Sequence, residues 1–341
     1  MRIAVDAMGS DDHPAPDVEG GVLAAREFGD TIILVGDEAA IHAELARHDT
    51  VGLPIEVRHA AEKIAMTDKP SAASRQKRDS SIHVGMGLVR SGEADAFVSA
   101  GNTGGVLAIA MFRQLGLGRI PGVRRPALGV VFPIPSHPIL IDNGANADCQ
   151  PEWLAQFALM GSLFMERVYQ IERPRVALIS NGEEEGKGNQ LIQETIPLLE
   201  ASGLNYIGNI EPKEYMGGMA DVGVTDGFTG NIIIKTAEAT ASHLLKLVRD
   251  EIMSTTRTKV GGLLARPAFE RARGALNPDE VGGAPLLGVN GVVIVAHGRS
   301  GGYAIKQAVG QARLAVANDI VAAIRDGVAS GTVSDSNETD A

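Results

Sequence analysis

Short, continuous apolar runs alternate with longer helical segments along nearly the whole chain. Continuous apolar runs predict strands buried on both faces, as in a parallel sheet that helices cover on each side. We therefore expect a doubly wound, three-layer α/β/α fold with a mostly parallel sheet. The expected strands are residues 2–8, 31–36, 55–59, 96–100, 128–132, 139–141, 175–179, 206–210, 222–225 and 292–296.

Helices are expected between these strands, several of them marked by a proline at the start. They are residues 14–28, 38–47, 71–90, 103–115, 151–169, 190–201, 229–253 and 301–325. Residues 1–328 are expected to form a single catalytic domain, with a helical hairpin protruding at about 240–278. The small, polar and acidic tail, 329–341, is expected to be disordered.

The formal net charge of −11 argues against binding along a nucleic acid. The one cysteine, Cys149, excludes a disulfide within a single chain and a cysteine-based zinc site. This fits a reducing cytoplasm, where we expect the protein to act. The N-terminus lacks the apolar core of a signal peptide. No apolar run approaches about 18 residues, so no segment is expected to span a bilayer.

Polar, glycine-containing loops follow six of the expected strands. Ligands bind at the carboxyl ends of strands in an open parallel sheet, so the six loops predict one shared site. The standard cofactor motifs do not occur: there is no G-x-G-x-x-G after the first strand, no phosphate-binding P-loop and no H-E-x-x-H. The loops read A-M-G-S-D-D, A-G-N-T-G-G, D-N-G-A-N-A-D, S-N-G-E-E-E-G-K-G-N, T-D-G-F-T-G-N and H-G-R-S-G-G.

The loop at 225–231 precedes a long helix, with Thr229 as its expected N-cap. Gly227 and Gly230 would let the backbone approach a ligand closely or adopt a positive φ. A helix start offers unpaired N–H groups and a positive dipole end to phosphate. The alternative is an ordinary turn between a strand and a helix.

The loops carry amide, hydroxyl and lysine donors, which suit an oxyanion and an attacking phosphate better than a covalent nucleophile. These donors are Asn102, Thr103, Asn143, Asn146, Asn181, Lys187, Thr229, Asn231, His297 and Ser300. Cys149 is interpreted as an inert thiol rather than a nucleophile, because no histidine adjoins it in sequence and Asp148 would raise its pKa.

The ordered motifs D-A-M-G-x-D, S-A-G-N-T-G, I-D-N-G-A-N, S-N-G-E-E-x-x-K-G, V-T-D-G-F-T-G-N and G-G-A-P-L-L-G-V-N-G-V-V-I-V-A-H-G resemble those of the PlsX family of bacterial phosphate acyltransferases. The resemblance runs from residue 1 to about 325. Ser10 stands where the family often has Gly, and Gly105 where it often has Ala.

The resemblance implies that acyl-[acyl carrier protein] and inorganic phosphate give acyl phosphate and free carrier protein, in phospholipid synthesis. The acyl phosphate would pass to a membrane glycerol-3-phosphate acyltransferase. It further implies a fold like that of phosphate acetyltransferases and of isocitrate and isopropylmalate dehydrogenases. The enzyme would be a cytoplasmic homodimer, peripherally associated with the membrane, without a metal or cofactor.

Two residues are expected to be catalytic. Lys187 would bind phosphate or support the leaving thiolate, and Asn231 would hold the phosphate or the oxyanion with the N–H groups from Thr229 onwards. The alternatives are a solvated charge that offsets Glu183 to Glu185, and a first-turn hydrogen bond of the helix. The rest of the expected substrate-binding set is Gly9, Asn102, Thr103, Asp142, Asn143, Asn146, Asn181, Asp226, Thr229, Gly230, His297 and Ser300.

An acidic carrier protein would need a local basic face on this acidic chain. One candidate contains Arg113, Arg119, Arg124 and Arg125. The other, from 246 to 273, includes the expected docking residues Arg257, Lys259, Arg266, Arg271 and Arg273. A solvated helix face is the alternative for each.

The second segment also carries V-G-G-L-L-A-R-P-A-F, in which two glycines and Pro267 are expected to interrupt the long helix at a hairpin tip. A basic, apolar tip would suit an anionic membrane surface. Packing in a dimer is the alternative. The expected tip residues are Val260, Leu263, Leu264 and Phe269.

Three other functions were weighed. A phosphate acetyltransferase would use acetyl-CoA in place of the carrier protein. A metal-dependent decarboxylating dehydrogenase would need acidic ligands, for which Asp11, Asp142 and Asp226 are available. A catalytically silent membrane scaffold is disfavoured by the density of polar loops.

Overall fold

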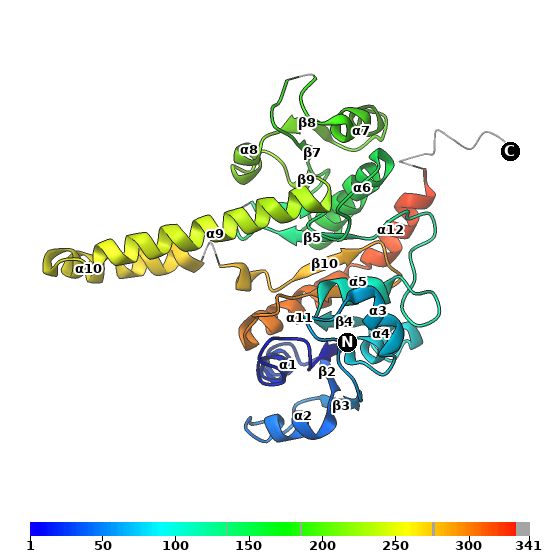
Figure 1. Ribbon diagram of the computed structural model, residues 1–341, viewed down its shortest axis with the longest axis vertical. Coiled ribbons are helices and arrows are strands. Elements are labelled where there is room, and N and C mark those ends of the chain that lie inside the picture. Colours follow the sequence, from blue (N-terminus) through cyan, green and yellow to red (C-terminus); the bar gives the residue numbers. More distant parts are fainter. Residues whose placement is uncertain (135, 185, 275–276, 332–341) are drawn as a thin grey trace.

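The computed structural model describes residues 1–341 except 135, 185, 275–276 and 332–341. One sheet of 11 strands runs through both lobes of the molecule, in the order β3-β2-β1-β4-β11-β10-β5-β6-β9-β7-β8 (Figure 1). The strands are β1 Arg2–Asp6, β2 Thr31–Gly36, β3 Ile55–His59, β4 Ala96–Ser99, β5 Ala127–Val131, β6 Ile139–Ile141, β7 Val176–Ile179, β8 Tyr206–Ile210, β9 Val222–Val224, β10 Ala284–Leu287 and β11 Val292–Val295.

The sheet consists of two parallel halves that run in opposite directions. Strands β3, β2, β1, β4 and β11 pair in parallel, and so do β6, β9, β7 and β8. Between the halves, β10 is antiparallel to both β11 and β5, and β5 is antiparallel to β6. The six polar loops therefore form two groups, one after β1, β4 and β11 and the other after β6, β7 and β9.

Helices cover both faces of the sheet, as expected. On β1, Ile3 and Val5 pack in a core with α1 and α11, whereas Ala4 packs in a second core with α4 and α5. The helices are α1 Ala15–Phe28, α2 Glu38–Leu45, α3 Pro70–Gln76, α4 Ser81–Ser91, α5 Thr103–Ala110, α6 Pro151–Val168, α7 Gln190–Glu200, α8 Pro212–Met216, α9 Gly227–Ile252, α10 Thr256–Gly274, α11 Gly302–Ala317 and α12 Ile320–Ala329, with a 3₁₀ turn at Pro278–Glu280.

Two helices expected to be continuous are each divided. The segment 71–90 breaks between α3 and α4, where the Ser80 side chain caps α4 by accepting from the His83 N–H. The segment 301–325 breaks between α11 and α12 at Asp319, which has a φ of 50°. Strand β10 and helix α8 were not expected. Of the tail 329–341 that was expected to be disordered, Ala329 is the last residue of α12, and residues 332–341 lie outside the described residues.

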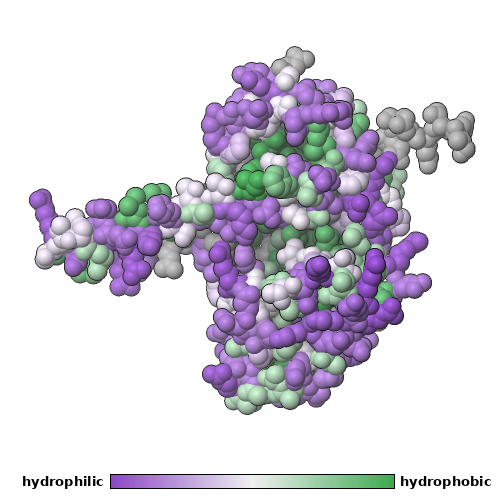
Figure 2. All heavy atoms as spheres, viewed as in Figure 1, coloured by the Kyte–Doolittle hydropathy of each residue, from purple (hydrophilic) through white to green (hydrophobic). Residues whose placement is uncertain are grey.

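Helices α9 and α10 form a hairpin that projects away from the sheet (Figure 1). The turn between them lies at residues 253–255, and α10 continues through Gly261, Gly262 and Pro267. The expected interruption at these residues is therefore wrong, and Val260, Leu263, Leu264 and Phe269 lie within α10. They are exposed, Leu263 by 70% and Leu264 by 80%. Figure 2 shows apolar patches among hydrophilic ones along the hairpin.

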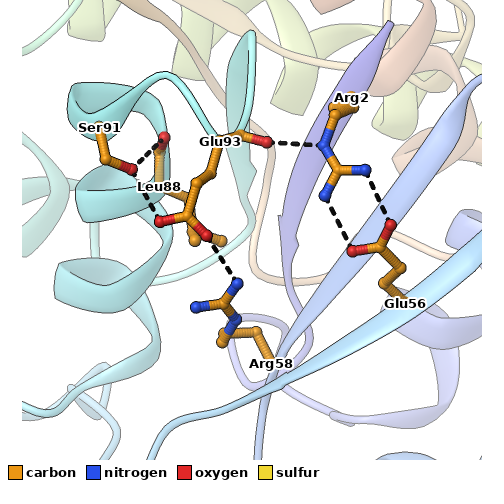
Figure 3. Close-up of polar contacts among 6 residues, drawn as sticks. All are labelled: Arg2, Glu56, Arg58, Leu88, Ser91 and Glu93. Carbon is orange, nitrogen blue, oxygen red and sulfur yellow. Dashed lines mark hydrogen bonds and ion pairs between the residues drawn. The ribbon is translucent and has the colours of Figure 1, made fainter.

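At the amino ends of the first-half strands, an exposed polar network joins β1, β3 and the loop before β4 (Figure 3). The Arg2 guanidinium donates to both carboxylate oxygens of Glu56, at 2.8 and 2.9 Å, and to the carbonyl oxygen of Glu93. Arg58 donates to the Glu93 carboxylate at 2.8 Å. Exposed pairs of this kind add little to the stability of a fold, because solvent screens their charges. Among the described residues, the structure contains no helix long and apolar enough to cross a membrane.

Candidate active site

The loop after β6 is organised around the carboxylate of Asp142, which is fully buried. Its Oδ1 accepts from the N–H groups of Leu128, Gly144 and Ala145, at 3.0–3.2 Å. Its Oδ2 accepts from the backbone and side-chain nitrogens of Asn146, at 2.7 and 2.9 Å. Burial raises the pKa of Asp142 above its usual value, while these donors oppose the shift. Asp142 therefore shapes the loop instead of facing a ligand.

The N-cap of α9 is Asp226, not Thr229 as expected. Oδ1 of Asp226 accepts from the Thr229 N–H and Oδ2 from the Thr229 hydroxyl, both at 2.8 Å. The Gly230 N–H donates to the Asp226 carbonyl, and the Gly227 N–H to the Asn146 carbonyl. The N–H groups of Thr229 and Gly230, which were expected to hold phosphate, are therefore used within the chain.

Gly227 and Gly230 allow a close approach, but to the chain itself and not to a ligand. Neither has a positive φ. A Cβ on Gly227 would lie 2.7 Å from the Asn146 carbonyl oxygen, and one on Gly230 would lie 2.0 Å from that of Asp142. The two glycines thus seat the start of α9 directly against the loop 142–146.

Asn231 lies in the first turns of α9, beside this contact, and its side chain is exposed. A Cβ on Gly144 would lie 3.0 Å from the Asn231 Nδ2, so this amide lies next to the β6 loop. In the same loop, Asn143 Oδ1 is buried and has no hydrogen-bond partner among the described residues. The Asn146 amide is occupied, because it donates to the Pro126 carbonyl as well as to Asp142.

The loop after β7 lies next to the start of α9 in the sheet order, because β7 pairs with β9. Asn181 Oδ1 accepts from the Gly188 N–H at 3.0 Å and so closes this loop on itself. The Lys187 side chain is exposed, and no described acidic residue forms a salt bridge with it within 4 Å. Glu185, one of the acids that Lys187 was expected to offset, lies outside the described residues.

On the other half of the sheet, the loops after β1 and β4 pack closely together. A Cβ on Gly9 would lie 2.8 Å from the Gly101 nitrogen. The Asn102 side chain caps α5 through the Gly105 N–H and donates to the carbonyls of residues 65, 66 and 68 at 3.2–3.3 Å. Asn102 thus holds neighbouring backbone, whereas Thr103 is exposed at the start of α5.

Behind the β1 loop, two carboxyl groups are buried. Asp6 accepts from the Ser99 hydroxyl at 2.7 Å, and Asp17 accepts from the Ser10 hydroxyl at 2.6 Å. Asp17 Oδ1 has no partner among the described residues. Burial raises the pKa of Asp17 to about 8, opposed by the Ser10 hydrogen bond and increased by Asp6. Ser10, the departure from the family pattern, therefore pairs with a neutral carboxyl group at pH 7.

The loop after β11 brings the two groups of loops into contact through α9. Lys235 Nζ lies 3.3 Å from His297 Nε2, and Arg299 lies 3.5 Å from the Glu238 carboxylate. The Gly298 carbonyl accepts from the Asp11 N–H, which joins this loop to the β1 loop. Ser300 is buried, and its hydroxyl accepts from the His297 N–H at 3.1 Å. Burial and the charges of Lys235 and Arg299 lower the pKa of His297.

Three residues of this contact, Lys235, Glu238 and Arg299, were not among the expected site residues. Lys235 follows Asn231 by one helical turn, so the two lie on one face of α9. Ile233, Ile234 and Ala237 pack on the core below. The i, i+4 spacing of Lys235 from Asn231 was the sequence signal available for Lys235. The same spacing occurs between polar residues on any solvated helix face. We call Asn231, Lys235 and Glu238 the α9 polar stripe.

Cys149 lies near the β6 loop, and its thiol donates to the Asn146 carbonyl at 3.4 Å. Burial, together with the Asp142 charge, raises the pKa of Cys149 to about 12. A thiol with this pKa is protonated at neutral pH and is a poor nucleophile. Among the described residues, no three His, Cys, Asp or Glu side chains gather as metal ligands would.

The two basic segments differ in how free their side chains are. Arg125 lies over the Trp153 ring, with Cζ 4.8 Å from its centroid, and Arg119 donates to the Arg124 carbonyl. On α10, Arg257, Lys259 and Arg271 are exposed, and Arg266 pairs with Glu270 at 2.7 Å. The side chain of Arg273 lies outside the description.

The chain matches the family described as fatty acid synthesis protein over residues 1–323. A phosphate acyltransferase of Geobacter sulfurreducens is 46% identical over 310 residues, which are 91% of this chain and 89% of that protein. One of Pelotomaculum thermopropionicum is 45% identical over 331 residues, covering 97% and 96% of the two chains.

Among solved structures, a phosphotransacetylase from Streptococcus pyogenes matches with a TM-score of 0.58 and 17% identity, covering 95% of this chain and 94% of the other. A branched-chain phosphotransacylase from Enterococcus faecalis matches with a TM-score of 0.57 and 12% identity, over 93% and 99%. At these identities the likeness shows a shared fold, and it confirms the expected α/β architecture.

Proposed function

The chain belongs to the fatty acid synthesis protein family, in which its relatives are phosphate acyltransferases, and from this membership we propose that it transfers an acyl group to inorganic phosphate. The acyl donor is an acyl-[acyl carrier protein], and the product is an acyl phosphate for phospholipid synthesis. The observation that carries the proposal is the 46% identity to a phosphate acyltransferase over 91% of the chain.

In the proposed reaction, an oxygen of hydrogen phosphate attacks the thioester carbonyl carbon. A C–O bond forms and the C–S bond breaks, and the proton of hydrogen phosphate ends on the carrier thiol. Phosphate is already a nucleophile at pH 7, so the protein needs to position it and to compensate charge. Donors must also meet the negative charge that develops on the carbonyl oxygen.

The exposed side chains beside the start of α9 suit these tasks. Asn231 holds the phosphate or the oxyanion, and Lys187 supports the departing thiolate or binds phosphate. His297 lies on the β11 loop, which reaches α9 through Lys235, and Thr103 is exposed at the start of α5. Five other expected residues shape the β6 loop and the start of α9, because their polar atoms form hydrogen bonds within the chain. They are Asp142, Asn146, Asp226, Thr229 and Gly230.

The carrier protein docks on α10, along which Arg257, Lys259, Arg266 and Arg271 are exposed. Arg273, the fifth expected docking residue, has a side chain outside the described part. These charges lie on a projecting hairpin of an otherwise acidic chain, so they offer a local attraction to an acidic partner.

The apolar residues of α10, Val260, Leu263, Leu264 and Phe269, contact an anionic membrane surface. Their exposure beside basic residues supports this role. The exposed Leu244 and Leu247 of α9 are available for packing in a homodimer. The enzyme therefore acts in the cytoplasm, attached peripherally to the membrane that holds the glycerol-3-phosphate acyltransferase which consumes its product.

The test is to incubate the purified chain with acyl carrier protein loaded with a long acyl group and with inorganic phosphate, without added metal. Acyl phosphate is trapped as a hydroxamate with hydroxylamine, and free carrier thiol is measured in parallel. Equal amounts of both products are expected. Turnover with acetyl-CoA but not with the acyl carrier protein would instead identify a phosphate acetyltransferase.

A further inference from the structure

One contact between the two groups of loops has no role in the reaction as described above. The ammonium of Lys235, on the α9 polar stripe, donates to Nε2 of His297, on the β11 loop, at 3.3 Å. We propose that Lys235 and the His297 ring together bind a phosphate group of a substrate. The inference deepens the proposed function and rests on it.

The need for such a pair follows from the start of α9. The Thr229 and Gly230 N–H groups donate to Asp226, and Asp226 places a carboxylate where a phosphate would otherwise bind. A phosphate beside Asn231 must therefore be held by side chains. Lys235 is the next cation on the same face of the helix.

The local charge favours an anion. Lys235 and Arg299 both contact Glu238, at 3.7 and 3.5 Å, so two cations share one carboxylate. Among these three residues one positive charge remains uncompensated. The Asp11 carboxylate also lies near His297 and the β11 loop, but it forms no ion pair within 4 Å with Lys235 or Arg299. Nε2 of His297 accepts from the Lys235 ammonium, so the ring proton lies on Nδ1 while this contact is made. When a phosphate oxygen takes the place of Nε2 beside Lys235, the other tautomer of the ring can donate to that phosphate.

The contacts that Lys235 makes in this structure are easily exchanged. Charge-assisted N–H···O bonds are typically about 2.7–2.9 Å, whereas the Lys235 contacts are 3.3 and 3.7 Å. Its side chain is 56% exposed. A phosphate oxygen can thus replace the ring nitrogen or the Glu238 carboxylate without disturbing the core beneath α9.

Two sources can supply the phosphate group. One is the attacking inorganic phosphate, and the other is the phosphodiester of the pantetheine arm of the carrier protein. Both present oxygens that carry negative charge. The kinetic constants for the two substrates separate them.

The test compares Lys235→Ala and Lys235→Arg with the wild-type chain. Lys213→Ala is the matched control, because it removes the same charge from an exposed position on α8, outside the expected site loops and both basic segments. Circular dichroism verifies the fold of each variant. The Michaelis constants for phosphate and for the acyl carrier protein are then measured, and binding of inorganic phosphate is measured by calorimetry without turnover.

For Lys235→Ala, a rise of about tenfold or more in one of the two constants is expected, with partial rescue in Lys235→Arg and no change in Lys213→Ala. A rise in the constant for phosphate, with weaker calorimetric binding, assigns the pair to inorganic phosphate. A rise in the constant for the carrier, absent with an acyl-pantetheine that lacks the phosphodiester, assigns it to the arm. Unchanged constants and unchanged phosphate binding overturn the inference, even where the wild-type chain makes acyl phosphate. A wild-type chain that binds phosphate through Lys235 but makes no acyl phosphate refutes the proposed function alone.

Discussion

The Cα of Gly230 faces the carbonyl oxygen of Asp142 so closely that a Cβ would lie 2.0 Å from it. Gly230→Ala must therefore push the start of α9 away from the loop 142–146, and Asn231 with it. We expect the substitution to destabilise the fold by about 1–3 kcal/mol and to reduce turnover strongly. Urea unfolding and the acyl phosphate assay measure the two effects.

Gly261→Ala is the control for this change. Gly261 lies within α10 with open space around its Cα, so alanine should stabilise that helix by about 0.5–1 kcal/mol. Equal behaviour of the two variants would show that the contact with Asp142 does not position α9.

Lys187→Ala should lower kcat by a factor of about 100 or more and leave the melting temperature unchanged. The side chain is exposed, so its removal costs little packing, whereas the proposed reaction loses a cation. Lys213→Ala, on the neighbouring α8, is the control, because Lys213 pairs with Glu211 and Glu214. Near-normal turnover of Lys187→Ala would refute a catalytic role.

Asp17→Asn should change how stability depends on pH. In the unfolded chain this carboxyl group ionises near its ordinary pKa of 3.8, but in the folded chain only at about 8. Between these values the folded state binds one more proton, so the wild-type free energy of unfolding falls as pH rises. The asparagine keeps an acceptor for Ser10 and does not ionise.

The stability of Asp17→Asn relative to wild type should therefore increase from pH 4 to pH 8 and then level off. Urea unfolding at several pH values measures this difference. A difference that is constant over the range would mean that Asp17 is ionised in the folded state.

A variant with Leu263→Glu and Leu264→Glu should lose binding to anionic vesicles. The two side chains are 70% and 80% exposed, so the change leaves the core of the protein intact. Val51→Glu, at an apolar residue that is 92% exposed on the far lobe, should keep vesicle binding. Flotation of liposomes measures binding, and light scattering measures the oligomeric state. Loss of a dimer with unchanged flotation would assign these leucines to contacts between two copies.

The sequence predicted most of the sheet because buried parallel strands are marked by continuous apolar runs, as at 31–36 and 292–296. It did not predict β10, Ala284–Leu287, which contains Pro285 and follows two glycines. This strand is antiparallel to both neighbours, so it leaves β5 running in the direction of β11, and the antiparallel pairing of β5 with β6 reverses the second half of the sheet. The antiparallel direction of this β5–β6 pairing, which the apolar runs do not reveal, therefore divides the six loops into two groups of three.

Within the site, the sequence identified polar residue types but not what each side chain contacts. Asp226 and Thr229 are both good caps, and only the folded loop shows that the aspartate accepts from the threonine. The pairing of Lys235 with His297 joins residues 62 positions apart. Local patterns contain no information about such a pair, and a lone lysine on a helix has the pattern of a solvated face.

Helix α9 runs without interruption from Gly227, beside the candidate site, to Ile252, next to the turn of the projecting hairpin. At about 1.5 Å per residue, Asn231 and Ile252 are some 30 Å apart on one rigid rod. The length of the helix thus fixes the distance between the candidate site and any surface that the projection contacts. The orientation of the candidate site is fixed as well, since each inserted residue would turn the far end by about 100° relative to Asn231. The number of residues in α9 therefore sets both the distance and the relative rotation between the candidate site and the hairpin tip that is proposed to contact the membrane.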